Sequence, residues 1–145
     1  MMKLVIAALL SFPLPPLGPT MGSTPKHTTV SSTATQTELP AVGLATYYAP
    51  GVMEKVIVNR ERWGHLPDCP ECQGYVALLY KADLGRTVCV NTGKGTFGPY
   101  MVADVAAAHH RATLIAKGWI LDAEYNLWVQ WGLPNKPTEI TVEDC

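Results

Sequence analysis

Gly98-Pro99-Tyr100-Met101-Val102-Ala103-Asp104-Val105-Ala106 is the stretch on which the fold depends. The Gly98-Pro99 pair predicts a turn, because proline fixes its own φ and glycine tolerates a tight entry. The apolar run that follows predicts a buried strand ending at Asp104. A carboxylate among apolar neighbours is costly unless it is paired, and beside a cleft it is a candidate acid or base. The alternative is a structural aspartate that caps the Ala-rich segment after it or binds loop amides.

Other short β-prone runs lie on both sides of this stretch, and turn residues close several of them. The expected strands cover residues 44–48, 75–80, 86–91, 100–105, 119–121 and 138–143. In the last run Ile140 and Val142 share one face, which is typical of a half-exposed strand. Asp122 is a candidate cap for a helix over 123–131, and the Ala-rich residues 105–117 predict a second. Short strands with one or two short helices predict a mainly β fold, a small barrel.

The chain before this domain has a different composition. Lys3, a short apolar run and several prolines predict a secretory signal peptide over residues 1–22. The Ser/Thr/Pro-rich residues 23–41 predict a disordered linker, which leaves 42–145 for the barrel domain. The apolar run is too short to cross a bilayer, so we expect a secreted protein, extracellular or in a cell wall, with no membrane anchor.

The net charge of −1 gives no basic stripe for phosphates, so we expect no nucleic-acid partner. Neither phosphate-loop nor dinucleotide glycine patterns occur, and no cofactor is expected. The adjacent His109 and His110 point in different directions on a helix or a strand, and we expect no metal site.

Four cysteines in an apparently secreted chain predict two disulfides. Cys69-Pro70-Glu71-Cys72 is also a C-x-x-C, which in a reducing compartment would indicate redox chemistry or half a zinc site, but no second one is present. Three pairings are possible, and we favour Cys69–Cys72 with Cys89–Cys145.

Four motifs, in order along the domain, resemble those of rare lipoprotein A, expansins and barwin-like proteins. They are Gly43-Leu44-Ala45-Thr46-Tyr47-Tyr48, Leu84-Gly85-Arg86-Thr87-Val88, Gly98-Pro99-Tyr100 with Asp104 after it, and Gly118-Trp119-Ile120-Leu121-Asp122. The resemblance implies a six-stranded double-psi β-barrel. It also implies that Asp104 and Asp122 lie in a polysaccharide groove. Asn59-Arg60-Glu61 is similar to a family Asn-Gly-Glu, which makes Glu61 a third candidate carboxylate.

Exposed aromatic rings stack on the faces of sugars, and Tyr48, Trp63 and Tyr100 are the candidate platforms for substrate binding. Lytic family members carry a histidine a few residues before the glycine matched by Gly85, whereas this chain has Leu78-Leu79-Tyr80.

We therefore expect a monomeric protein that binds cell-wall polysaccharide or loosens the wall in an expansin-like manner, without hydrolysis. One alternative is a lytic transglycosylase or glucan hydrolase that uses Asp104 or Asp122 as its catalytic residue. Another is a secreted effector or inhibitor that binds a protein.

Overall fold

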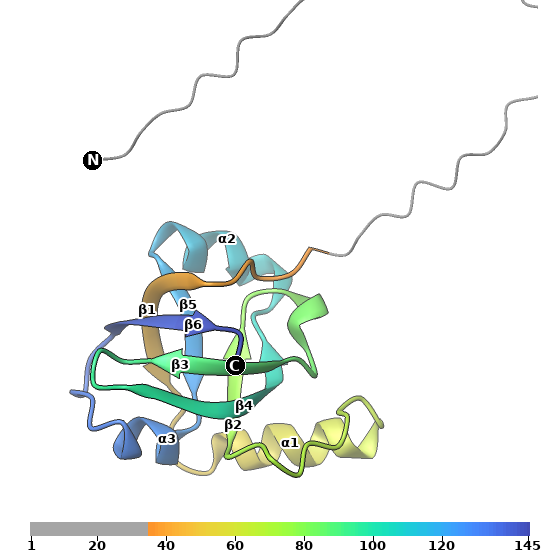
Figure 1. Cartoon of the computed structure of the whole chain (residues 1–145). Helices are drawn as coiled ribbons and strands as arrows, with labels where there is room; N and C mark the ends of the chain where they lie inside the picture. The colour runs from red at the N-terminus through yellow and green to blue at the C-terminus, as the bar shows by residue number, and fades with distance from the viewer. Residues whose placement is uncertain (1–34) are drawn as a thin grey trace, which may run out of the picture. The chain divides into compact units, whose positions relative to one another are not determined.

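Six strands form a closed barrel in the computed structural model, which describes residues 35–145 (Figure 1). The strands are β1 (Ala41–Tyr47), β2 (Tyr75–Leu78), β3 (Thr87–Asn91), β4 (Thr96–Val105), β5 (Trp119–Ala123) and β6 (Thr138–Glu143). The order around the barrel is β1-β5-β2-β4-β3-β6. The expected mainly β fold with six strands is confirmed. The predicted signal peptide over 1–22 lies outside the described residues.

The barrel encloses an apolar core built by alternation along the strands. Ala45, Val88, Val102 and Val142, one from each of four strands, are all 0% exposed. Successive residues of a strand point to opposite faces, so the polar residues that alternate with core positions along a strand lie on the outside of the barrel. Trp128 and Trp131, from the last helix, pack against the same core cluster.

The topology repeats itself in two halves. Strand pairs β1–β5 and β2–β4 are parallel, and the remaining neighbours are antiparallel. Exchanging β1, β2 and β3 with β4, β5 and β6 leaves every neighbour and every orientation unchanged. The helices follow the same pattern: α1 (Val52–Arg62) joins β1 to β2, and α2 (Ala108–Ala116) joins β4 to β5. The 3₁₀ turn η1 (Lys81–Asp83) then corresponds to α3 (Tyr125–Gln130).

Three α-helices are present in residues 35–145, where one or two were expected. The unexpected one is α1. Its Met53 is buried, and Val56, Ile57 and Arg60 are half-buried, which is the i, i+3, i+4, i+7 stripe of a helix with one face packed. The expected cap role of Asp122 is wrong, because Asp122 lies inside β5 and α3 begins only after Glu124.

Gly98 and Pro99 lie within β4 and not in a turn before it. Val88 pairs with Tyr100 and Val90 pairs with Phe97, so Gly98 and Pro99 together face the single residue Cys89, as in a β-bulge. Gly98 has a φ of 130°, and a Cβ atom there would lie 3.0 Å from the Cys89 sulfur. The pair therefore bends the strand, and glycine is required at its first position.

The ordered contacts of the domain begin within the predicted linker. Thr37 is 5% exposed, and its backbone N–H and hydroxyl donate to the two carboxylate oxygens of Asp83, at 2.9 and 2.6 Å. Arg86 donates to the Thr37 carbonyl at 2.6 Å and to Asp83 at 3.1 Å. Because Asp83 is fully buried, these bonds fix the segment that leads into β1, and the barrel unit starts earlier than residue 42.

Both favoured disulfides are confirmed. Cys69 pairs with Cys72 in the loop before β2, and Cys89 of β3 pairs with Cys145. Residues 35–145 contain no helix long and apolar enough to cross a membrane.

Candidate functional site

One row of side chains crosses four neighbouring strands on the outside of the barrel. Thr46 of β1 pairs with Asp122 of β5, Asp122 pairs with Ala77 of β2, and Ala77 pairs with Asp104 of β4. We call Thr46, Asp122, Ala77 and Asp104 the outer row. Residues that are paired across neighbouring strands lie on the same face of the sheet. Asp104 and Asp122 therefore lie on either side of the Ala77 side chain, which is a single methyl group. The two carboxylates that sequence reasoning selected are therefore brought together.

Asp104 is held by two side chains from other elements. The Tyr48 hydroxyl donates to its Oδ2 at 2.9 Å, and Arg60 Nη2 of α1 donates to its Oδ1 at 3.0 Å. The Arg60 and Asp104 side chains are 29% and 21% exposed. The residue beside the start of α2 is Ala107, so Asp104 does not cap that helix. Burial, and then the negative charge of Asp104, raise the pKa of Tyr48, which keeps it a hydrogen-bond donor.

Asp122 has a different environment. Its Oδ1 accepts a hydrogen bond from the Thr46 hydroxyl. Burial raises the pKa of the Asp122 carboxyl, and the nearby charge of Asp104 raises it further. A raised pKa keeps the proton on the Asp122 carboxyl to higher pH, which is the property of a proton donor.

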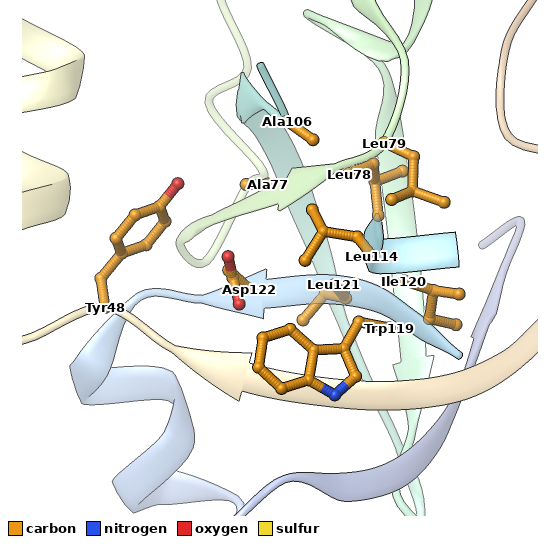
Figure 2. Close-up of a pocket in the computed structure, with 10 residues that line it drawn as sticks. All are labelled: Tyr48, Ala77, Leu78, Leu79, Ala106, Leu114, Trp119, Ile120, Leu121 and Asp122. Carbon is orange, nitrogen blue, oxygen red and sulfur yellow. The ribbon is translucent and has the colours of Figure 1, made fainter. Parts of the chain in front are cut away.

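Two depressions are each lined by one of these two aspartates. The first lies between α2 and β5; Tyr48, Trp119 and Asp122 line it together with apolar side chains (Figure 2). The second lies beside α1, and Arg60, Trp63 and Asp104 line it. Tyr48, which lines the first, donates a hydrogen bond to Asp104, which lines the second. We call the two depressions together the row groove.

Each of the two depressions of the row groove is lined by one indole. Trp63, just after α1, is 72% exposed. Trp119, at the start of β5, has the Lys117 ammonium 5.5 Å from its ring centroid. The row groove therefore combines hydrogen-bonding groups with the apolar faces of two indoles.

Two other predicted site residues lie elsewhere. Tyr100 is 1% exposed, and its hydroxyl accepts a hydrogen bond from Trp131 Nε1 at 3.0 Å in the core. The expectation that Tyr100 is an exposed stacking platform is wrong. Glu61 is exposed, but it lines a separate depression beside the Cys69–Cys72 disulfide, so it does not join the aspartate pair.

Sequence reasoning missed the roles of Arg60 and Thr46. The helical stripe from Met53 to Arg60 would have placed the arginine on the packed face of a helix. Strand alternation would have placed Thr46 on the opposite face from the buried Ala45. Neither pattern indicates which residue Arg60 or Thr46 contacts, because the contact depends on which strands become neighbours in the barrel.

No three His, Cys, Asp or Glu side chains in the part of the chain that the structure describes gather to hold a metal ion. The His109 and His110 rings, 4.0 Å apart between centroids, lie exposed on α2. Comparison with protein-family models, with curated proteins and with solved structures finds no match for this chain.

Proposed function

We propose that this protein is an extracellular cell-wall protein that binds polysaccharide in the row groove and acts without hydrolysing it. The observation that carries the proposal is the outer row itself, with two carboxylates on one face of the barrel, and with the half-buried Trp119 and the exposed Trp63 each lining one of the adjoining depressions. Sugar hydroxyls donate to carboxylates, and the apolar faces of sugar rings stack on indoles.

The shape of the groove favours a polymer over an enclosed small molecule. Ligand pockets for small molecules usually enclose about 300–1,000 Å³ and bury most of the ligand. The depression between α2 and β5 is smaller than this, about 50 Å³, and the one beside α1, about 500 Å³, is open to solvent and does not enclose a ligand. A chain of sugars that lies along the surface needs no enclosure.

The contacts of Asp104 favour binding without hydrolysis. Ordinary glycoside hydrolysis needs one carboxyl as acid and a second, free carboxylate as base or nucleophile. Both oxygens of Asp104 already accept hydrogen bonds, one of them from a guanidinium. The raised pKa of Asp122 supports the second candidate, a lytic transglycosylase or glycosidase in which Asp122 donates the proton.

Two further observations support the setting of this proposal. The internal two-fold topology is what we expect of a double-psi barrel, the fold that the motif resemblance implies. Two disulfides in residues 35–145 are compatible with an oxidising, extracellular environment.

A pull-down on insoluble cellulose, chitin and peptidoglycan tests the proposal. We expect the wild-type protein to bind at least one polymer, and Trp63→Ala to weaken that binding about tenfold, which is about 1.4 kcal/mol. The matched control is Val129→Ala, which truncates an exposed apolar side chain elsewhere, on α3, and which should bind normally. Equal binding by the two variants, or no binding by the wild type, would refute the proposal. Release of soluble sugars that Asp122→Asn abolishes would establish the enzymatic candidate instead.

A further inference from the structure

A separate depression, with a volume of about 370 Å³, has the Cys69–Cys72 disulfide in its wall. We call it the disulfide depression. None of the residues that line it lines either part of the row groove. Its apolar surface comes from residues that include Leu66, Tyr75 and Met101. Because ligand pockets usually measure about 300–1,000 Å³, it has room for a few side chains of a bound peptide beside the disulfide.

The Cys69–Cys72 bond can open while the barrel stays constrained. It joins residues 3 apart in the loop before β2, and both cysteines are half-buried. The Cys72 backbone N–H donates to the Cys69 carbonyl at 3.1 Å, a turn that does not need the S–S bond. The Cys89–Cys145 bond spans 56 positions, and Cys89 is 7% exposed although Cys145 is exposed. Opening the short-range bond therefore leaves the long-range one in place.

The charge of the disulfide depression is negative. Glu61 and Asp68 line it, and both are exposed. Within residues 35–145, no lysine, arginine or histidine lines it; Arg62 and His65 are exposed and are not part of its wall. Thiol–disulfide exchange releases a thiolate, and negative charges nearby oppose its formation. A positive charge on the incoming molecule offsets this effect.

We propose that the disulfide depression is a thiol–disulfide exchange site whose substrate is a cysteine thiol in a basic peptide segment. The peptide thiolate attacks one sulfur of the Cys69–Cys72 bond and forms a mixed disulfide, while the other sulfur leaves as a thiolate and takes up a proton. A second peptide thiolate then attacks the peptide sulfur of the mixed disulfide and releases the oxidised peptide. Two electrons thus pass from two peptide thiols to Cys69–Cys72, which becomes two thiols. This activity is independent of polysaccharide binding.

Two synthetic peptides test the proposal on the full-length wild-type protein. Each has one cysteine, flanked in one peptide by two lysines and in the other by two glutamates. Exchange is followed by alkylating the thiols that form on the protein and locating them by mass spectrometry. Each rate is divided by the rate of the same peptide with bis(2-hydroxyethyl) disulfide. This neutral reference removes the difference in intrinsic reactivity between the two peptide thiols.

We expect the normalised rate of the lysine peptide to exceed that of the glutamate peptide at least about fivefold at low salt, which is about the effect of one close charge pair in water. The ratio should fall below about twofold at about 1 M salt, where the Debye length is about 3 Å. Alkylation should appear at Cys69 and Cys72 first. A ratio of one or less at low salt, or earlier alkylation of Cys89 and Cys145, would overturn the inference. Polysaccharide binding would stand in either case.

Removing the two carboxylates gives a second test. Glu61→Gln with Asp68→Asn neutralises the disulfide depression, and Glu38→Gln with Glu139→Gln removes two exposed carboxylates elsewhere as the matched control. We expect the first double variant to reduce the low-salt ratio to less than about twofold and the control to keep it. A thermal melt verifies that each variant is folded, and the wild-type comparison stands independently of both. Retention of the full ratio by the folded first variant would overturn the assignment of the site.

Discussion

Asp104 and Asp122 lie in the same row but in environments that separate their chemistry. Asp104 is partly exposed and is paired with a guanidinium and a phenol, whereas Asp122 accepts a hydrogen bond from a neutral hydroxyl. Two titratable groups whose surroundings differ in this way take different roles at one site. Asp104 is suited to accept hydrogen bonds in a fixed position, and the raised pKa of Asp122 suits it to exchange a proton.

The raised pKa of Asp122 predicts a pH-dependent stability. The folded protein binds this proton more tightly than the unfolded chain does, so the contribution is fully present below about pH 4, the pKa of an unperturbed aspartate. It is lost as the pH rises through the folded-state pKa. Asp122→Asn lacks this titration. We expect the wild-type free energy of unfolding, minus that of the variant, to fall as the pH rises above about 4 in urea titrations. A difference that rises over this range would contradict the assignment.

Asp104→Asn separates a binding role from a structural one. Ion pairs that are partly exposed contribute about 0–1 kcal/mol, so we expect the free energy of unfolding to fall by no more than about 1 kcal/mol. Polysaccharide binding should fall about tenfold or more, because the fixed charge at the centre of the groove is lost. The control is Asp144→Asn, since Asp144 is 77% exposed and its carboxylate lies 3.9 Å from Arg86 Nη2. A loss of about 3 kcal/mol with normal binding would make Asp104 structural.

Helix α1 shows how one element supplies both packing and chemistry. Met53 anchors the helix in the molecule, and Arg60, two turns later on the same face, reaches Asp104. Gly51, with a φ of 82°, allows the chain to turn sharply from β1 into this helix. The packed face of α1 therefore determines where the guanidinium lies, and Trp63 follows directly at its end.

Truncating the anchor of α1 should be costly. Replacing a buried methionine with alanine costs about 2–5 kcal/mol, so we expect Met53→Ala to lower the free energy of unfolding by an amount in that range. Val58→Ala changes an exposed residue of the same helix and should alter stability by less than about 0.5 kcal/mol. Chemical denaturation measures both. Equal, small effects would mean that α1 does not dock on the barrel as the structure has it.

Two disulfides constrain very different lengths of the chain. Cys89–Cys145 spans 56 positions and ties the end of the chain to β3, whereas Cys69–Cys72 spans 3. In the chain-entropy treatment these bonds contribute about 4 and about 2 kcal/mol respectively. Removing the long-range bond should therefore weaken the barrel as a whole.

We expect Cys89→Ala with Cys145→Ala to lower the free energy of unfolding by about 4 kcal/mol, and Cys69→Ala with Cys72→Ala by about 2 kcal/mol. Denaturation of the two double variants tests the order. Mass spectrometry of the unreduced wild type should detect no alkylated cysteine among the four. A larger loss from the short-range pair would contradict the entropy argument.

The sequence determined what each short segment could become. Alternation in 138–143 predicted that Ile140 and Val142 share one face of β6, and both are buried in the core. The even number of cysteines predicted two disulfides. These properties are local or compositional, so they can be read from the chain alone. The i, i+3, i+4, i+7 stripe of α1 was also present in the sequence. It lies among β-prone runs, and no helix was predicted there.

Only the tertiary structure decided which residues meet. Asp104 and Asp122 face each other across Ala77 because β2 lies between β4 and β5, although β2 precedes both in the chain. Tyr100 is an aromatic residue after a Gly-Pro pair in the sequence, but its place in β4 turns it into the core. The alternation of residues determines which face of a strand is buried. Which strands become its neighbours, and in which register, depends on parallel pairing between segments that lie far apart in the sequence. The site is made of such pairings, and for that reason the sequence supplied its residues and the barrel supplied its geometry.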